Sequence, residues 1–251
     1  MSGPPGPGGA QPGDAQPEGA QPEGAQPAGA RLAGLDTCAV SDALDKLGLT
    51  GVVTGLPPVT VTRRITGRVI TVQLGPAEGA ARSERHIATA AIEAAGRDDV
   101  IVVAAGGRTD APGWGGILSL AAVTRGAGGV IVDGSCRDVD EARELGLPVY
   151  ARACVPRTAR GRLVETGWNQ PVRVGDVTVA PGDLVVADGS GVVFIAAARA
   201  EEVVTAAAWI ADREAAMARR IRAGEPVSQV MSAVYETMLE RGGDLGRGPG
   251  P

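Results

Sequence analysis

The stretch from residue 113 to residue 152 constrains the fold most strongly, because it alternates glycine turns with helical and strongly apolar runs. A glycine turn at Gly115 and Gly116 opens an Ala-rich run over residues 117–125, which has the spacing of a helix. Residues 130–133, three apolar residues followed by Asp133, are then predicted to be a buried strand, and residues 100–105 before the stretch form a continuous apolar run typical of a strand buried on both faces. This alternation indicates an α/β domain.

Hydrophobic patterns on both sides of this stretch extend the same architecture. Apolar residues at helical or alternating spacing predict helices over 35–47, 83–95, 139–145 and 203–221, and strands over 59–62, 65–74, 100–105, 148–152, 184–187 and 192–195. The sequence therefore predicts an α/β fold of one domain, with mixed β-sheets, flanking helices and C-terminal helices that pack in an oligomer.

Individual residues mark the expected ends and turns of these elements. Ser83 is the expected N-cap of its helix, and Gly67 is a candidate β-bulge. Alternating valines around Gly175 and Asp176 predict a hairpin. Pro226 is expected to begin a second C-terminal helix, which would carry Val230, Val234 and Met238.

Composition limits the location and the partners of the chain. With 44% hydrophobic but only 2% aromatic residues, the core must consist mainly of Val, Ile, Leu and Ala. A formal net charge of −5 gives no electrostatic reason to expect nucleic acid or an anionic membrane as a partner. No apolar run is long enough to span a bilayer, and the N-terminus lacks the pattern of a secretory signal. Three scattered cysteines, Cys38, Cys136 and Cys154, indicate reduced thiols and a cytoplasmic protein.

The chain divides into one domain and two tails. Residues 1–30 repeat Ala-Gln-Pro-Glu/Ala-Gly and cannot bury apolar surface, so we expect them to be disordered. The main domain is expected over residues 31–241, and the Gly-rich residues 242–251 are expected to be a flexible tail.

The rarest residue types narrow the chemistry. Lys46 is the single lysine and lies on the polar side of a short amphipathic helix, where we expect it to be solvated. Schiff-base catalysis and pyridoxal phosphate anchoring use a desolvated lysine, so C–C bond chemistry here would have to use a metal. His86 is the single histidine, which excludes a multi-histidine metal site, and we expect it to be packed or to cap a helix.

The glycine turn and the end of the following strand form a candidate binding site. A glycine turn that opens a helix offers free backbone N–H groups to an anion. The strand that ends in Arg137 and Asp138 offers a cation beside a ligand for a hard metal ion. In isolation, an Arg-Asp pair at a strand end is more often a surface ion pair. Together, however, the two features suit a small 2-oxo acid held by a divalent ion.

Five segments occur in an order that resembles one known family. They are Thr-Cys-Ala-Val-Ser-Asp-Ala-Leu at 37–44, Trp-Gly-Gly-Ile-Leu at 114–118, Asp-Gly-Ser-Cys-Arg-Asp-Val-Asp-Glu at 133–141, Pro-Val-Tyr-Ala-Arg at 148–152 and Pro-Gly-Asp-Leu-Val-Val-Ala-Asp at 181–188. Over about residues 35–195, and more loosely to residue 222, the chain resembles the RraA-like family. That family includes class II 4-hydroxy-4-methyl-2-oxoglutarate aldolases, which also decarboxylate oxaloacetate, and a regulator that binds RNase E.

The resemblance implies a metal-dependent lyase and gives each matching residue a role. The substrate carboxylate would be bound by the backbone N–H groups of Gly115, Gly116, Ile117 and Leu118. Arg137 would pair with the pyruvate moiety and stabilise its enolate. Asp138 would bind Mg²⁺ or Mn²⁺, with water in most other positions. The metal would polarise the ketone, and either C–C cleavage or loss of CO₂ would then give the same pyruvate enolate.

The resemblance also implies assembly, because family members form trimers or hexamers with the site at a subunit interface. A glutamate on the C-terminal helix of a neighbouring subunit often approaches the metal-bound water in the family. Glu214 is the best match for that glutamate in this sequence.

One position departs from the aldolase pattern. The residue after the first glycine is typically Asp or Glu in the aldolases, but here it is Gly116. Removing a positioned acid or base typically costs about 10²–10⁴-fold in rate. Either another acid such as Asp110 substitutes, or the reaction differs, or activity is lost. The alternatives are therefore another enolate-forming substrate in a specialised pathway, or a non-catalytic RraA-type regulator that binds a protein.

Three further polar residues near these motifs have structural interpretations. Cys136 is expected to pack in the core, with a reactive thiol beside Arg137 as the alternative. Asp133 either shapes the site or caps a turn, and Asp188 is expected to form a turn.

Overall fold

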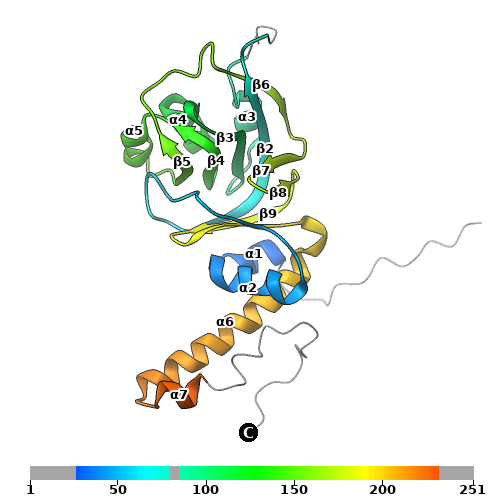
Figure 1. Ribbon diagram of the computed structural model, residues 1–251, viewed down its shortest axis with the longest axis vertical. Coiled ribbons are helices and arrows are strands. Elements are labelled where there is room, and N and C mark those ends of the chain that lie inside the picture. The colour runs from blue at the N-terminus through cyan, green and yellow to red at the C-terminus, as the bar shows by residue number, and fades with distance from the viewer. Residues whose placement is uncertain (1–26, 80–84, 232–251) are drawn as a thin grey trace, which may run out of the picture.

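The structure is a computed structural model that describes residues 27–79 and 85–231 (Figure 1). The described strands are β1 (Val52–Val53), β2 (Ile65–Pro76), β3 (Val100–Trp114), β4 (Gly129–Cys136), β5 (Val149–Cys154), β6 (Leu163–Trp168), β7 (Val172–Val174), β8 (Val177–Val179), β9 (Leu184–Asp188) and β10 (Gly191–Ile195). The main sheet follows the order β1-β10-β9-β2-β3-β4-β5, and β6 also pairs with β2. β7 and β8 form the hairpin predicted around Gly175 and Asp176.

The main sheet has a parallel half and an antiparallel half that meet at β2. Strands β2, β3, β4 and β5 run parallel, with Val100 paired to Val69 on one side and to Gly129 on the other. Strand β9 pairs antiparallel with both β2 and β10, and β6 pairs antiparallel with β2. The mixed sheet confirms the predicted α/β class, and β2 is the strand that carries both kinds of pairing.

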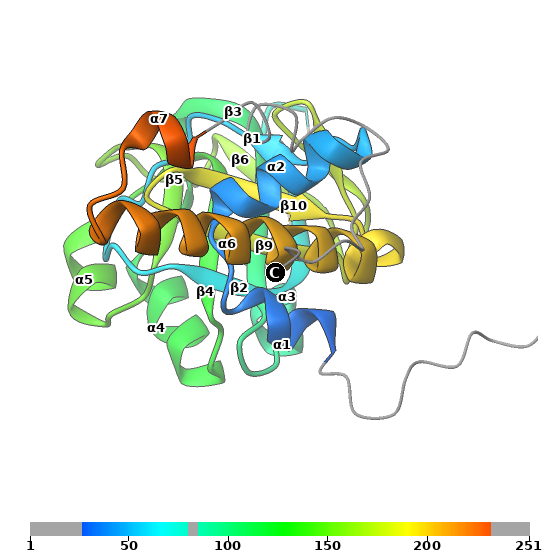
Figure 2. The same cartoon turned by 90° about the horizontal axis from the view of Figure 1, so that it is seen from below.

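Helices cover the two halves separately (Figures 1 and 2). On the parallel half, apolar residues of α3 (Thr89–Ala94), α4 (Gly116–Arg125) and α5 (Val139–Glu144) share one core with β3 and β4. On the antiparallel half, α1 (Ala28–Leu32), α2 (Thr37–Leu47) and α6 (Ala200–Arg222) share a second core with β9 and β10. A short helix α7 (Val227–Val230) follows α6. No helix among the described residues is long and apolar enough to cross a membrane.

The strongly patterned stretch folds as predicted, and its strands run further than their apolar runs. The predicted strand over 100–105 continues as β3 to Trp114, and the strand over 130–133 continues to Cys136. Every residue of β4 is buried, as expected for a parallel strand with neighbours on both sides. The extensions carry both strands to the glycine turn and to the Arg-Asp pair.

The predicted strand over residues 59–62 is wrong. Pro58 forms only an isolated bridge with Tyr150, and the following residues lie beside β5 without a regular ladder. The side chain of Thr60 takes the place of backbone pairing with β5. Its Oγ1 donates to the Leu147 carbonyl at 2.6 Å and accepts from the Val149 N–H at 2.8 Å. Pro57 and Pro58, just before this segment, have no N–H to donate, so they add no donors to a ladder with β5.

The predicted helix over residues 83–95 is shorter than expected. Helix α3 begins only at Thr89, because Ala88 has a left-handed backbone with φ 65° and interrupts the helical path. The expected N-cap Ser83 lies outside the described residues. The segment before α3 is instead held by Glu165 of β6, whose carboxylate accepts a hydrogen bond from the Ala88 N–H at 2.6 Å.

Short or irregular elements escaped the sequence analysis. Helix α1 and strands β1 and β6 lack a clear apolar period and were not predicted. Gly67 is not a bulge, because β2 keeps a regular register with β9 there, and the irregularity falls between Gln73 and Leu74. Gly67 instead allows a close approach, since a Cβ on it would lie 2.1 Å from the Asp98 carbonyl oxygen.

Lys46 is buried rather than solvated, which corrects the expectation from its helix. Its residue is only 5% exposed, and its Nζ lies over the Trp209 ring of α6, 5.3 Å from the ring centroid. The apolar stem packs between α2 and α6 while the ammonium group meets the aromatic face. The face of α2 that reads as polar is therefore partly covered by α6.

The C-terminal region agrees with the sequence as far as it is described. Helix α6 matches the predicted long helix, and α7 follows Pro226 and contains Val230. Val234 and Met238 lie outside the described residues. Packing of these helices in an oligomer, and the limits of the domain, stay predictions. Helix α1 crosses the boundary that was placed at residue 30.

Two aspartates join distant parts of the chain. Asp133 is buried on β4, where it forms an ion pair with Arg152 and accepts a hydrogen bond from the Gly175 N–H. It therefore shapes the interior and does not merely cap a turn. Asp188 accepts from the Ser190 N–H as the predicted turn former, and it also accepts from the N–H and the hydroxyl of Thr37 at the start of α2.

The burial of Asp133 gives a prediction about stability. Asp133→Ala should lower the free energy of unfolding by about 3 kcal/mol, because it leaves the partly buried Arg152 guanidinium without its counter-charge. The matched change Asp140→Ala removes an exposed partner of Arg143 and should cost less than about 1 kcal/mol. Urea denaturation of both variants measures the difference. Equal costs for the two changes would contradict a structural role for the Asp133–Arg152 pair.

Candidate active site

The site begins where β3 turns into α4. Gly115 precedes the helix in an extended conformation, and Gly116 is the first helical residue. The Trp114 indole N–H donates to Ser119 Oγ at 2.9 Å, and Ser119 Oγ donates to the Gly115 carbonyl at 3.0 Å. These buried bonds hold the turn in place from inside the first helical turn. In the described part of the chain, the N–H groups of Ile117 and Leu118 have no acceptor, as expected at a helix N-terminus.

The Arg-Asp pair reaches this turn from the neighbouring strand. Cys136 at the end of β4 pairs with Trp114, and the Arg137 N–H donates to the Trp114 carbonyl at 3.0 Å. Arg137 Nε donates to both carboxylate oxygens of Asp138 at 3.0 Å. Asp138 Oδ2 also accepts from the Gly116 N–H at 3.0 Å. The structure thus brings together Gly116, Arg137 and Asp138 from the two predicted motifs.

The Asp138 side chain binds the N-terminus of α4 and not that of its own helix, α5. It occupies the N-cap position of α5 in a left-handed conformation, with φ 55° and ψ 41°, yet its side chain makes no capping bond to α5. A non-glycine residue in this conformation costs about 1 kcal/mol. The backbone geometry turns the carboxylate back toward the glycine turn, where it satisfies one of the exposed N–H groups of α4.

The surroundings of Asp138 keep its carboxylate ionised. Partial burial raises its pKa, but the hydrogen bond from the Gly116 N–H and the ion pair with Arg137 together outweigh burial. The net result is a pKa below the ordinary value of an aspartate. The group is therefore an anion at neutral pH, and its side chain keeps 28% of its surface exposed.

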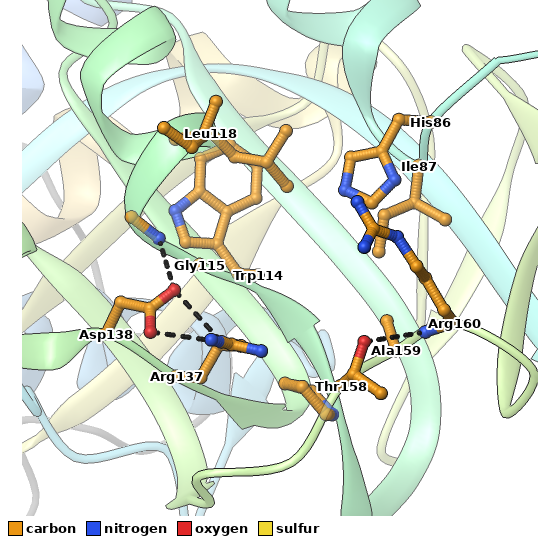
Figure 3. A pocket seen from close by; sticks show the side chains of 13 residues that line it. His86, Ile87, Trp114, Gly115, Leu118, Arg137, Asp138, Thr158, Ala159 and Arg160 are labelled. Carbon is orange, nitrogen blue, oxygen red and sulfur yellow. Dashed lines mark hydrogen bonds and ion pairs between the residues drawn. The ribbon is translucent and has the colours of Figure 1, made fainter.

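A pocket of about 250 Å³ opens beside the pair and the turn (Figure 3). Trp114, Gly115, Gly116, Ile117, Leu118, Arg137 and Asp138 line one part of it. His86, Ile87 and Arg160 face them from the other side (Figure 3). Two arginines and a histidine against one acidic side chain make the described wall favourable to an anionic ligand.

The sequence analysis missed the far wall of this pocket. Thr158, Ala159 and Arg160 come from the loop between β5 and β6, which has no periodic pattern. Arg137 holds that loop, because its Nη1 donates to the Arg157 carbonyl at 3.1 Å. His86 was expected to be packed or to cap a helix, but its side chain is exposed and lines the pocket. Only its carbonyl has a capping contact, accepting from Thr89.

Two other acidic candidates lie away from the pocket walls. Asp110 is bound by Arg108 through two hydrogen bonds of 2.8 Å, and the contact holds its pKa at about 2. It is not among the pocket-lining residues, and its carboxylate is held by Arg108. Glu214 lies on α6, where burial together with Asp42 and Asp36 raises its pKa. Its approach to the site of a neighbouring subunit stays a prediction.

Cys136 has the structural role expected from its surroundings. It is almost fully buried in the core of the parallel half, and its Sγ lies 3.9 Å from that of Cys154. Burial raises the pKa of the Cys136 thiol well above its usual range. A buried, protonated thiol packs as a small apolar group and is not a nucleophile at neutral pH.

The residues at Asp138 fit a hard divalent cation that keeps most of its water. Among the described residues, no group of three or more His, Cys, Asp or Glu side chains could hold a metal ion. A site of this kind therefore offers one protein carboxylate, ionised and facing a polar pocket. Mg²⁺ and Mn²⁺ accept oxygen ligands, and Mg²⁺ commonly retains several waters beside one or two carboxylates.

Comparison with known proteins agrees with the fold. The profile of the RraA-like family, described as Aldolase/RraA, matches residues 37–194, which is more than half of the chain. The protein therefore belongs to the RraA-like family, and its mixed sheet is the RraA fold.

The share of a relative's length that matches this chain differs between relatives. Protein DlpA of Legionella pneumophila is 29% identical over 194 residues, which cover 77% of this chain but only 31% of DlpA. The chain thus spans less than a third of that relative. A Halalkalibacterium halodurans protein, provisionally named 4-hydroxy-4-methyl-2-oxoglutarate aldolase, is 31% identical over 174 residues, which cover 68% of this chain and 77% of the relative.

Solved structures show the same fold. An uncharacterized protein from Pseudomonas syringae superimposes with a TM-score of 0.74 at 30% identity, over 82% of this chain and 96% of that chain. Streptomyces coelicolor RraAS2 is described as an unusual member of the RNase ES inhibitor RraA protein family. It superimposes with a TM-score of 0.70 at 28% identity, over 76% of this chain and 96% of that chain.

The contacts of Asp138 predict how it titrates. Arg137→Ala should raise the pKa of Asp138, because the variant loses the ion pair but keeps the partial burial that favours the neutral acid. Carboxyl ¹³C NMR titration of labelled wild type and variant measures both values. Arg143→Ala, which removes an exposed arginine on the following helix, should leave the Asp138 titration unchanged. An unchanged pKa in Arg137→Ala would contradict the contact.

Proposed function

We propose that this protein is a divalent-metal-dependent lyase that cleaves C–C bonds of 2-oxo acids through a pyruvate enolate. The reaction would be of the 4-hydroxy-4-methyl-2-oxoglutarate aldolase or oxaloacetate decarboxylase type. One observation carries the proposal: Arg137 and the ionised Asp138 are joined to the open N-terminus of α4 by the Gly116–Asp138 hydrogen bond. A helix N-terminus, an arginine and an ionised carboxylate therefore line one pocket, which supports the proposal.

The residues of this chain would act on the substrate as follows. The N–H groups at the start of α4, from Gly115, Ile117 and Leu118, would bind the carboxylate of the 2-oxo acid, whereas the Gly116 N–H already donates to Asp138. Arg137 would orient the oxo group with the guanidinium nitrogens that do not face Asp138, and would stabilise negative charge as it develops there. Asp138 would hold Mg²⁺ or Mn²⁺, which supplies Lewis-acid polarisation of the oxo group when bound.

The enolate accounts for both reaction types with one arrangement of residues. When the C3–C4 bond breaks, its electron pair moves toward the oxo oxygen and forms the enolate of pyruvate. The leaving fragment is CO₂ in decarboxylation and a carbonyl compound in retro-aldol cleavage. Arg137 and the α4 N–H groups would bind the pyruvate part, which is common to both substrates, so they need not differ between the two reactions.

The name given to the Halalkalibacterium halodurans relative supports an aldolase of this kind. Two alternatives each have an observation in their favour. Gly116 lacks the acid typical of the aldolases, which favours another enolate-forming substrate. The structural likeness to Streptomyces coelicolor RraAS2, a member of an RNase ES inhibitor family, favours a protein-binding regulator. We also propose a homotrimer or hexamer in the cytoplasm, with no nucleic acid or membrane as a partner.

Pyruvate release is the direct test of the proposed lyase. Wild type with Mg²⁺ or Mn²⁺ should release pyruvate from oxaloacetate or from 4-hydroxy-4-methyl-2-oxoglutarate, and EDTA should stop the release. Asp138→Ala should lower kcat/KM by about 10²–10³-fold, because it loses metal-derived charge stabilisation of several kcal/mol. Coupled assay with lactate dehydrogenase measures the release.

The exposed variant Asp140→Ala provides the control and should retain wild-type activity. No turnover above the background of metal alone would reject this lyase. Metal binding at Asp138 without turnover would then favour another enolate-forming substrate. A stable complex with a ribonuclease, formed without metal, would favour the regulator.

A further inference from the structure

The carboxylate of Glu141 occupies the space that a side chain at position 116 would need. A Cβ built on Gly116 would lie 1.8 Å from Glu141 Oε2 and 2.9 Å from Glu141 Cδ. No side chain can share that space, so only glycine at 116 admits this position of Glu141. The end of the Glu141 side chain, on the third residue of α5, therefore lies against the first residue of α4.

Glu141 differs from the other acids near the site in having no bound partner. Asp138 is paired with Arg137, Asp140 with Arg143, and Asp110 with Arg108. For the Glu141 carboxylate, the described part of the chain provides no hydrogen bond or ion pair. Glu141 is an exposed residue, so its carboxylate oxygens are accessible to solvent and to a ligand.

The position of Glu141 connects it to the pocket. Gly116, against which the carboxylate lies, is one of the pocket-lining residues. Glu141 itself lines an adjoining hollow, and Arg137 and Asp138 line both spaces. The carboxylate thus lies at the edge where the anion-binding turn, the arginine and the metal-ligating aspartate meet.

We propose that Glu141 is the acid–base group that moves the proton at C3 of the pyruvate unit. This inference rests on the proposed lyase function and names the residue that performs its proton transfer. In retro-aldol cleavage, the carboxylate takes the C4 hydroxyl proton while the C3–C4 electron pair becomes the enolate. The protonated Glu141 then gives that proton to C3: the O–H bond breaks, the C3–H bond forms, and pyruvate leaves.

The same step acts on pyruvate alone and can be followed without C–C cleavage. Glu141 removes a proton from the methyl group of pyruvate, and the resulting enolate takes a deuteron when the solvent is D₂O. Loss of the methyl ¹H signal of pyruvate in NMR therefore reports the proton transfer that is assigned to Glu141.

The placement of Glu141 is tested by stability, independently of activity. Gly116→Ala should displace the flexible end of Glu141, so it should destabilise wild type more than it destabilises Glu141→Ala. The same cycle with Asp140→Ala, on the same helix but facing Arg143, should be additive. Thermal unfolding of the single and double variants gives both couplings. An additive Gly116–Glu141 cycle would overturn the placement.

The chemical role is tested by Glu141→Gln, which keeps the shape and removes the acid–base group. Deuterium exchange of pyruvate with Mg²⁺ should fall by about 10²–10⁴-fold. Affinity for oxalate, a stable mimic of the enolate, should remain within a few-fold of wild type in calorimetry. Asp140→Asn should exchange at the wild-type rate. In the double variant Gly116→Asp with Glu141→Ala, a carboxylate returns from α4, and exchange should recover at least tenfold over Glu141→Ala.

The outcomes separate this inference from the proposed function. Active wild type together with an equally active Glu141→Gln overturns the role of Glu141 and leaves the lyase in place. Wild type that neither exchanges nor cleaves rejects the lyase itself, and the acid–base role falls with it. Loss of exchange together with an equal loss of oxalate affinity would show that Glu141 binds the ligand and does not transfer the proton.

Discussion

The hydrogen bond from the Gly116 N–H to the Asp138 carboxylate is the contact on which the rest of the site depends. It joins the start of α4 to the end of β4, two points that are 22 residues apart. Asp138 adopts a left-handed backbone to reach that N–H, and Arg137 then binds both of its oxygens. The same bond holds the first turn of α5 against α4, where the carboxylate of Glu141 meets Gly116.

The parallel half of the sheet is what makes this contact possible. Parallel neighbours place their carboxyl ends at one edge, and β3 and β4 each run past their apolar runs to that edge. Trp114 and Cys136 are paired in the final register of the two strands, so the glycine turn and the Arg-Asp pair follow side by side. The second core, built from α1, α2, α6 and the antiparallel strands, lies on the other half and leaves this edge open.

Much of the site could be predicted because its central residues lie in one continuous stretch. The run from residue 113 to 152 contains the turn, the helix and both strands, and each has a period that stands out in the sequence. Arg160 and His86 could not be found in the same way. They come from irregular segments whose position is decided by contacts such as that between Arg137 and the Arg157 carbonyl. Asp110 is close to Gly116 in sequence, yet it does not line the pocket, and Arg108 binds its carboxylate.

Two residues show how packing changes what a sequence position means. Lys46 lies on a face of α2 that reads as polar, yet Trp209 of α6 covers it. Gly116 stands where the aldolases typically have an acidic residue, yet the space left by its missing side chain holds the carboxylate of Glu141. Neither partner is detectable from local spacing, since Trp209 is far along the chain and Glu141 belongs to another element.

By itself, the sequence determined the α/β class and the places of most main strands along the chain, because these depend on local periodicity. It also pointed to Gly115, Gly116, Arg137 and Asp138, because these residues lie in contiguous motifs. The tertiary structure alone decided that the Asp138 side chain binds α4 and not its own helix, that a loop supplies the far wall of the pocket, and that a second carboxylate faces Gly116. Those features arise from contacts between elements that are separate in sequence, and local patterns carry no information about such contacts.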